Sequence, residues 1–453
     1  MSTIAAISTP NAVGGISVIR ISGEDAISIA DIVFKSFSGA ALSSMKGYTC
    51  AYGEVKKEDQ KIDDVIATVF RNPKSYTGED IVEISCHGGL YITRQILRII
   101  LENGAVLAQP GEFTKRAFLN GKMSLTQAEA VMDVISAGSK NELRHAVALK
   151  DGAMFKKISG IRQDITRILG DLAAWADYPE DDIPYVEPDK LLAELEQISC
   201  ALTVLSQTYD YGKLIRDGIK TVIVGRPNVG KSTLMNCMSG YERSIVTNIP
   251  GTTRDIVEEH IKIGDLTLAL SDTAGIRETD DVIEKKGVEI AIEKISQADL
   301  VLAVFDVSQV LSDDDRKIID SVKNKNVIII LNKTDKEPLL DESYFDSVFS
   351  YIVHISAKNS EGLDELQKYL EQMFINEEIE ADNSILANER QKICVDCCLK
   401  SVNEAADVLR NGESLDAVTV IIDEALENLL KLTGESVTES VVNEVFSRFC
   451  VGK

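Results

Sequence analysis

The strongest chemical signal in the sequence is a phosphate-binding loop at residues 225–232. The segment Gly225-Arg-Pro-Asn-Val-Gly-Lys-Ser232 follows a short apolar run, Thr221–Val224, and fits the pattern GxxxxGK[ST] between a strand and a helix. Its glycines let the backbone wrap phosphates with N–H groups pointing inward. Lys231 supplies a charge to the β- and γ-phosphates and Ser232 a hydroxyl to Mg²⁺, while the helix expected from Thr233 onward adds its positive dipole end.

Two later segments indicate that the base is guanine. Asn332-Lys-Thr-Asp335 follows the expected strand Val327–Leu331. Asp335 can accept hydrogen bonds from both the ring N–H and the exocyclic amine of guanine, a pair of donors that adenine lacks. Ser356-Ala-Lys358 follows Val353–Ile355 and offers a backbone N–H to the guanine oxygen. Alone, the first segment could be a solvated turn; in this order and at these strand ends, both predict guanine.

The γ-phosphate side of the site is predicted by two further segments. Asp272-Thr-Ala-Gly275 follows the expected strand Leu266–Leu270, and its acidic residue suits the Mg²⁺ shell. Thr247-Asn-Ile-Pro-Gly-Thr-Thr-Arg-Asp255 suits a segment that the γ-phosphate orders. Ile276 stands where many small GTP-hydrolysing proteins carry a glutamine that orients water. Since isoleucine cannot orient water, the catalytic group must come from elsewhere.

These motifs need a parallel sheet to bring them together, and residues 218–376 alternate strand-like and helical runs as such a sheet requires. Residues 1–118 mix short strand-like runs with helices such as Leu90–Glu102, which predicts an α+β domain. Residues 119–217 and 377–453 carry a helical period. Because the last stretch is too short for a core of its own, we expect both to form one helical domain that the α/β domain interrupts.

Local signals set several element boundaries. Ser124 and Gln127 form a capping box ahead of a helix that ends near Gly138. The acidic, proline-containing stretch Asp177–Asp189 predicts a loop. Ser436 with Glu439 predicts the cap of a last helix that runs to the C-terminus.

Composition narrows the class of protein. The chain has 453 residues, 44% of them apolar, and a net charge of −24. That charge argues against a general basic surface for RNA, so any RNA contact must be local or shared with a partner. We find no apolar run of membrane-helix length and no secretory signal, and the eight scattered cysteines do not suggest disulfides. We therefore expect a cytoplasmic protein.

Together these motifs resemble the TrmE-Era-EngA-type GTPases, and the flanking sequence resembles the tRNA-modifying members of that family over essentially the whole chain. One departure is Val451, where the family tail usually has isoleucine. The segments that carry the resemblance are Ser17–Gly23, Tyr76–Glu83, His87–Gly89, Pro110–Lys122, Gln127–Ala130, Gly225–Ser232, Gly251–Asp255 and Phe446–Lys453.

The resemblance implies a multidomain α/β plus α protein. A folate-binding and dimerisation α+β domain is expected at 1–118, and a Ras-like P-loop GTPase domain at 218–376 is inserted into a helical domain formed by 119–217 and 377–453. The implied GTP-binding residues are Asn228, Val229, Gly230, Lys231, Ser232, Thr233, Thr247, Asn248, Ile249, Pro250, Gly251, Thr252, Thr253, Asp272, Thr273, Ala274, Gly275, Asn332, Lys333, Asp335, Ser356, Ala357 and Lys358.

The resemblance also supplies candidates for catalysis. It implies Mg²⁺ at Ser232 and Thr253, and a Glu284 that positions the attacking water. The implied K⁺ ligands are Asn228, Thr247, Ile249 and Thr252, and the implied catalytic residues are Asn228, Arg254, Asp255 and Glu284. A cation beside the phosphates would stabilise developing charge much as an arginine finger does. Without the resemblance, Asn228 could equally be a turn residue, and Glu284 would be read as part of a solvated face.

A second implied site binds 5-formyltetrahydrofolate or a related one-carbon folate through Arg20, Glu83, Lys122 and Lys453. The residue types fit a ligand with a glutamate carboxylate and an aminopterin edge, although each alone would be read as a surface charge. Cys450 is either a thiol for tRNA modification or a small apolar residue of the last helix.

Other cysteines and histidines carry weaker signals. Cys394, Cys397 and Cys398 suggest metal only weakly and are better read as core or surface residues of a helix. His87 could face the folate cleft or mark a structural turn.

The implied function is K⁺-dependent GTP hydrolysis by a homodimer. With the FAD-dependent partner MnmG (GidA), it would install an aminomethyl or carboxymethylaminomethyl group at carbon 5 of the wobble uridine of certain tRNAs. Hydrolysis would drive G-domain dimerisation. Two alternatives are a non-catalytic switch, which would need a basic RNA-binding module that we do not find, and a folate-binding module with a vestigial nucleotide site, which conflicts with five intact motifs.

Overall fold

The computed structural model describes residues 1–58, 60–177, 187–241, 259–270, 295–374 and 384–452. The chain forms two compact units. The first contains residues 1–132, 150–195 and 400–453, and the second contains residues 133–149 and 196–399. The predicted domain boundaries stay a prediction, since the two units divide the helical stretches differently.

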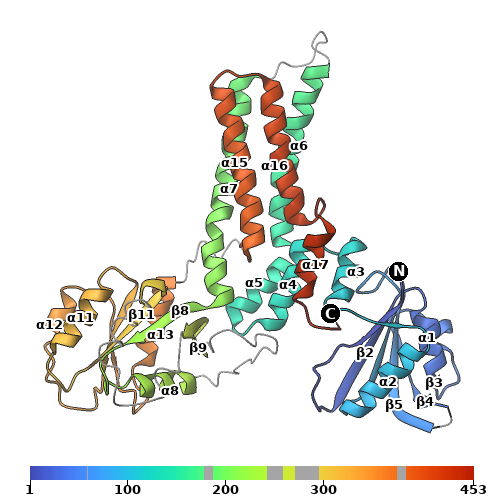
Figure 1. The fold of residues 1–453 in the computed structure, drawn as a ribbon, viewed down its shortest axis with the longest axis horizontal. Coiled ribbons are helices and arrows are strands. Elements are labelled where there is room, and N and C mark those ends of the chain that lie inside the picture. The colour runs from blue at the N-terminus through green and yellow to red at the C-terminus, as the bar shows by residue number, and fades with distance from the viewer. Residues whose placement is uncertain (59, 178–186, 242–258, 271–294, 375–383, 453) are drawn as a thin grey trace. The chain divides into compact units, whose positions relative to one another are not determined.

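The first unit contains a seven-stranded sheet in the order β3-β4-β5-β6-β2-β1-β7, antiparallel except for the pair β1 and β7. The strands are β1 (Ile4–Ile7), β2 (Ile16–Ser22), β3 (Phe34–Ser36), β4 (Thr49–Lys57), β5 (Gln60–Phe70), β6 (Ile81–His87) and β7 (Val106–Leu107). Helices α1 (Ala26–Val33) and α2 (Leu90–Glu102) lie against one face of the sheet (Figure 1), and apolar residues of that face pack against them. This confirms the predicted α+β domain.

The helical part of the first unit is built on apolar stripes. In α6 (Ala153–Asp177), the apolar residues that recur at helical spacing from Ile158 to Leu172 are buried. Helix α16 (Leu415–Thr433) packs along α6, and Gly434 ends it in the left-handed conformation. The shorter helices are η1 (Leu42–Ser44), α3 (Glu112–Leu119), α4 (Leu125–Ser136) and α17 (Glu439–Ser447), and α4 extends into the second unit.

Three boundary predictions need correction. The predicted loop Asp177–Asp189 is wrong at both ends, because Asp177 is the last residue of α6 and Pro188 is the first residue of α7 (Pro188–Asp217), while residues 178–186 lie outside the described ranges. Proline suits the first helical position because the N–H there needs no partner. The cap of α17 is Thr438, whose side chain accepts from the N–H of Val441, so the predicted Ser436 cap is wrong. Helix α17 ends at Ser447 and does not reach the C-terminus.

The second unit contains a six-stranded sheet in the order β13-β12-β11-β8-β10-β9, parallel except for β9. Its strands are β8 (Ile219–Val224), β9 (Glu259–Ile263), β10 (Leu266–Leu270), β11 (Leu300–Asp306), β12 (Val327–Asn332) and β13 (Ile352–Ile355). Strands β11 and β12 are buried along their whole length, as expected for a parallel sheet covered on both faces.

Helices cover both faces of this sheet. Helices α8 (Lys231–Tyr241) and α13 (Leu363–Phe374) pack on one face, and α11 (Asp313–Val322) and α12 (Ser343–Asp346) pack on the other. The unit also holds α5 (Lys140–Lys150), most of α7 and the first half of α15 (Glu389–Arg410). This arrangement is the predicted Ras-like α/β fold. Within the described residues, no helix is both long enough and apolar enough to cross a membrane.

Candidate guanine-nucleotide site

The phosphate loop connects β8 to α8 at the carboxyl end of the parallel strands, where α/β sheets bind ligands. Helix α8 begins at Lys231, two residues earlier than the sequence suggested. The ammonium of Lys231 donates to the carbonyl oxygens of Gly225 and Arg226 at 2.7 Å each. Burial lowers the pKa of Lys231. An anion in the loop would relieve this desolvation cost, which suits a phosphate-binding lysine.

The predicted base-recognition segment, Asn332–Asp335, is hydrogen-bonded directly to the phosphate loop. The side-chain amide of Asn332 donates to the carbonyl of Val229 at 2.8 Å, and its oxygen accepts from the N–H of Ala357 at 3.1 Å. A Cβ on Gly230 would lie 2.3 Å from that amide nitrogen, so only glycine fits beneath Asn332. The three motifs therefore form one site.

Asp335, the residue predicted to bind the base, is held from the next strand. The hydroxyl of Ser356 donates to one carboxylate oxygen of Asp335 at 3.0 Å. Ser356 is fully buried, whereas Asp335 is exposed and so open to a ligand. This arrangement leaves a fixed acceptor at the site edge, as guanine recognition requires.

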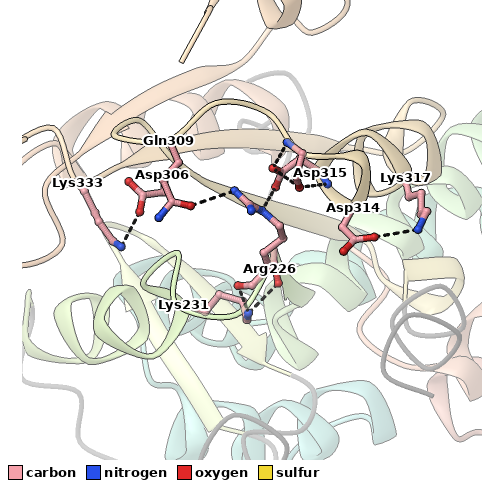
Figure 2. A network of polar contacts seen from close by, with 10 residues as sticks. Arg226, Lys231, Asp306, Gln309, Asp314, Asp315, Lys317 and Lys333 are labelled. Carbon is pink, nitrogen blue, oxygen red and sulfur yellow. Dashed lines mark hydrogen bonds and ion pairs between the residues drawn. The ribbon is translucent and has the colours of Figure 1, made fainter. Parts of the chain in front are cut away.

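Sequence reasoning missed Asp306, the last residue of β11. Its carboxylate accepts from the ammonium of Lys333 at 2.6 Å (Figure 2), and the same ammonium donates to the carbonyl of Asn228 at 2.7 Å. Burial alone would raise the pKa of Asp306, but the hydrogen bonds from Lys333 and Ser308 outweigh it and lower the pKa. A signal was available, since an acidic residue ends an otherwise apolar strand beside β8.

The sequence also gave no hint of the contact that holds Arg226 of the phosphate loop. Its guanidinium donates to Asp315 at 2.7 Å and lies 3.4 Å from the side-chain oxygen of Gln309 (Figure 2). Asp315 also closes the capping box of α11 with Ser312. One buried carboxylate thus joins the phosphate loop to the start of α11.

The two segments predicted to lie on the γ-phosphate side, residues 247–255 and 272–275, are outside the described residues. Ser232 and Thr233 lie exposed in the first turn of α8, and Lys358 is exposed after β13. The predicted site residues outside the described ranges are Thr247, Asn248, Ile249, Pro250, Gly251, Thr252, Thr253, Arg254, Asp255, Asp272, Thr273, Ala274, Gly275 and Glu284. Their roles stay predictions, as does the consequence drawn from Ile276.

Two of the four predicted folate residues meet in the first unit. Arg20 and Glu83 are paired across β2 and β6, and their side chains form an ion pair at 2.8 Å. The guanidinium of Arg20 also lies over the rings of Tyr76 and Phe113, 5.4 and 5.5 Å from their centroids. Such a half-buried, stacked cation is not an ordinary surface charge.

The other two are not part of that pair. The ammonium of Lys122 donates to the carbonyl of Pro73 at 3.0 Å, and Lys453 lies outside the described residues. Sequence reasoning also missed Arg116, whose guanidinium pairs with Glu79 at 3.1 Å and with Glu112 at 2.8 Å and has a side chain only 4% exposed.

The structure also describes the surroundings of His87, Cys450 and Cys398. His87 ends β6, and its Nδ1 lies 2.6 Å from the buried carboxylate of Asp63. Cys450 is exposed and follows the end of α17, so the reading as a residue of the last helix is wrong. Cys398 in α15 is buried, which raises its pKa to about 12, and no cluster of potential metal ligands occurs within the part of the chain that the structure describes.

Comparison with known proteins places these features in a family. A profile described as the MnmE helical domain matches residues 125–450, and one described as the GTP-binding protein TrmE N-terminus matches residues 3–122. The first of these spans more than half of the chain.

Whole-chain relatives agree with the profiles. The tRNA modification GTPase MnmE of Clostridioides difficile (strain 630) is 41% identical over 459 residues, covering 100% of this chain and 99% of that protein. The protein of the same name from Lactococcus lactis subsp. cremoris (strain SK11) is 44% identical over 453 residues, covering 100% and 98%.

Among solved structures, Era in complex with MgGDPNP and a segment of 16S ribosomal RNA is 30% identical over 40% of this chain and 66% of that chain. Its TM-score of 0.27 is too low to support an argument. The profiles and the whole-chain relatives suffice: this chain belongs to the family of the tRNA modification GTPase MnmE.

Proposed function

We propose that this chain is a K⁺-dependent GTPase that works with the FAD enzyme MnmG (GidA) on the wobble uridine of certain tRNAs. Together they would install an aminomethyl or carboxymethylaminomethyl group at carbon 5 of that base. Membership of the family supports the general part of this assignment, namely that the chain is a GTP hydrolase in tRNA modification. Because its substrate would be tRNA, we propose a cytoplasmic location.

The observation that carries the nucleotide assignment is the direct bonding of the base-recognition segment to the phosphate loop. Asn332 bonds to Val229, and Lys333 bonds to Asn228, at 2.8 and 2.7 Å. A nucleotide that satisfies Asp335 with its base would therefore meet a phosphate loop of fixed position. Preorganised contacts of this kind lower the entropic cost of binding and of reaction.

The residues of the phosphate loop suit the roles proposed for them. Lys231 would exchange its contacts with two loop carbonyls for the phosphate oxygens. Ser232 presents a hydroxyl in the first turn of α8, where Mg²⁺ would be held beside the phosphates. Glu284 is proposed to position the attacking water, and Arg254 and Asp255 to assist.

The residue proposed to hold K⁺ is Asn228. It is exposed, and within the described residues its hydrogen bonding is limited to its backbone carbonyl, which accepts from Lys333. Its amide oxygen accepts no hydrogen bond from the described part of the chain, and a neutral oxygen suits a monovalent cation. A cation bound there, with Thr247, Ile249 and Thr252, would neutralise charge that develops on the phosphates.

The proposed folate cleft centres on Arg20 and Glu83, with Lys122 and Lys453 nearby in the family pattern. A carboxylate such as Glu83 can accept from an aminopterin edge, and a stacked guanidinium can bind a carboxylate. A bound folate would supply the one-carbon unit. We propose that Cys450, exposed near the end of the chain, is available for the modification chemistry.

The decisive biological test is the nucleoside content of tRNA from a strain that lacks this gene. We expect the wobble-uridine modification to disappear and to return with the wild-type gene. Complementation with Asn228→Ala should fail, whereas complementation with the surface variant Asp314→Asn should succeed. Normal modification in the deletion strain would remove the assignment.

A further inference from the structure

Lys333 makes a bridge between two groups that are far apart in sequence. Its ammonium donates to Asp306 Oδ2 at 2.6 Å and to the carbonyl oxygen of Asn228 at 2.7 Å. The Asp306 side chain is 1% exposed and that of Lys333 is 24% exposed, so water competes little for this ion pair. Asp306 and Lys333 (Figure 2) thus link the end of β11 to Asn228 in the phosphate loop.

Asp306 is itself held in place. Its other carboxylate oxygen accepts from the backbone N–H of Ser308 at 3.0 Å and from the Ser308 hydroxyl at 2.7 Å. Its backbone is in register with Asn332 across β11 and β12. The carboxylate is thus a fixed anchor, because both of its oxygens and its backbone are engaged.

The far end of the chain is a backbone position that needs an anchor. Asn228 has a φ of +66°, in the left-handed region. An asparagine tolerates this region better than most residues, but the conformation is still less favourable than ordinary helical backbone. The adjacent carbonyl of Val229 is also bonded, to Asn332. Two consecutive loop carbonyls are therefore fixed by the base-recognition segment.

We propose that Asp306 is a positioning residue for the Asn228 side chain, acting through Lys333. Fixing the Asn228 carbonyl selects one conformation of the loop, and that conformation determines where the amide oxygen of Asn228 is presented. The inference rests on the proposed role of Asn228 as a K⁺ ligand. It adds that cation affinity at the phosphates depends on a carboxylate that touches neither the cation nor the nucleotide.

A merely structural role for Asp306 makes a different prediction. Loss of a structural carboxylate would weaken nucleotide binding equally in K⁺ and in Na⁺. Loss of a positioning carboxylate would weaken the K⁺-specific part, because the base contacts of Asp335 and the phosphate contact of Lys231 remain in place.

The test is a double-mutant cycle in the full-length protein, with Asp306→Asn, Asn228→Ala and the double variant. The K⁺ concentration that gives half-maximal GTP turnover should rise about tenfold in Asp306→Asn, as expected for loss of one charge-assisted hydrogen bond. In the Asn228→Ala background the same change should have no further effect on K⁺ dependence. Asp314→Asn, which removes an exposed carboxylate that pairs with Lys317 at 2.8 Å, is the matched control and should behave as wild type.

A second readout does not depend on turnover. The affinity of a fluorescent, non-hydrolysable GTP analogue should be higher in K⁺ than in Na⁺ for the wild type, and this difference should vanish in Asp306→Asn while affinity in Na⁺ is retained. If Asp306→Asn does not fold, Ser308→Ala removes one support of the carboxylate and should shift the K⁺ requirement in the same direction by a smaller factor.

The outcomes separate the two proposals. A wild-type protein with no preference for K⁺ sinks the proposed K⁺ dependence and this inference with it. A wild type that prefers K⁺, combined with an Asp306→Asn variant of unchanged K⁺ requirement or of equal losses in both salts, overturns the inference alone.

Discussion

Asn332 donates its side-chain amide to the carbonyl oxygen of Val229 over 2.8 Å, so the residue that begins the base-recognition segment also supports the phosphate loop. Asn332 is only 2% exposed, and its remaining oxygen is taken by Ala357. The segment predicted to recognise the base and the phosphate loop are therefore held together by one buried amide. A substitution at either end of this hydrogen bond should therefore affect both the phosphate loop and the segment that begins at Asn332.

Gly230→Ala should abolish nucleotide binding. Its added Cβ would lie 2.3 Å from the Asn332 amide nitrogen, and the residue has a φ of +101°, which L-residues rarely adopt. The matched control is Gly240→Ala in α8, where nothing lies within 4 Å of the added Cβ. That variant should be more stable by about 0.5–1 kcal/mol and bind normally. Titration with a fluorescent GDP checks both; normal binding by Gly230→Ala would contradict the steric argument.

Asp335→Asn should exchange the preferred base. The carboxylate can accept two hydrogen bonds from guanine, whereas an amide offers one acceptor and one donor. Xanthine presents an oxygen where guanine has its amine, so it suits the amide. We expect affinity for GTP to fall roughly 100-fold while XTP binds better than GTP, since mismatched buried polar groups discriminate strongly. Competition between the two nucleotides measures this, and unchanged preference for GTP would refute the role of Asp335.

Arg116→Met should destabilise the first unit, which contains the seven-stranded sheet. The change leaves Glu79 and Glu112 without the buried cation that both contact, a loss of about 3–5 kcal/mol. The comparison is Arg98→Met, which removes an exposed pair with Glu102 that solvent screens, so its loss should cost little stability. Denaturant unfolding followed by a probe in that domain compares the two. Equal losses would show that Arg116 is not a buried anchor.

Asp306 should make the stability of the nucleotide domain depend on pH in the acid range. Because its folded pKa is depressed, its contribution to stability is present above the unfolded value of about 3.9 and is lost as pH falls through the lower folded value. At neutral pH, Asp306→Asn should be less stable than the wild type, and the difference should shrink below about pH 4. Unfolding midpoints of both proteins, measured from about pH 3 to about pH 7, test this direction of change. A stability difference between them that widens in acid would contradict it.

Much of the fold could be predicted because its signals are local. The strand runs and the capping box of Ser124 with Gln127 each depend on residues within a few positions of one another, and the structure has them as expected. The errors are also local and have a reason. Thr438 and Ser436 both offer a hydroxyl near the start of α17, and the sequence pattern alone did not decide which of them caps the helix.

The candidate site was predicted only as a set of motifs. The chemistry of contiguous residues such as Gly225–Ser232 can be predicted from their order, but the contacts that support them join positions that are far apart in the sequence. Asp306 and Lys333 are 27 residues apart, and Arg226 and Asp315 are 89 apart. Neighbouring parallel strands bring such residues together, and nothing in the spacing of a single sequence reveals those pairs.

The central claim is that this chain hydrolyses GTP with a cation at Asn228 in place of a catalytic glutamine. The most direct measurement is GTP turnover by the full-length protein in K⁺ and in Na⁺ at equal ionic strength, for the wild type and for Asn228→Ala. We predict fast turnover in K⁺, slow turnover in Na⁺ and no difference between the salts in the variant. Equal rates in both salts for the wild type, or a K⁺ preference that survives Asn228→Ala, would contradict the claim.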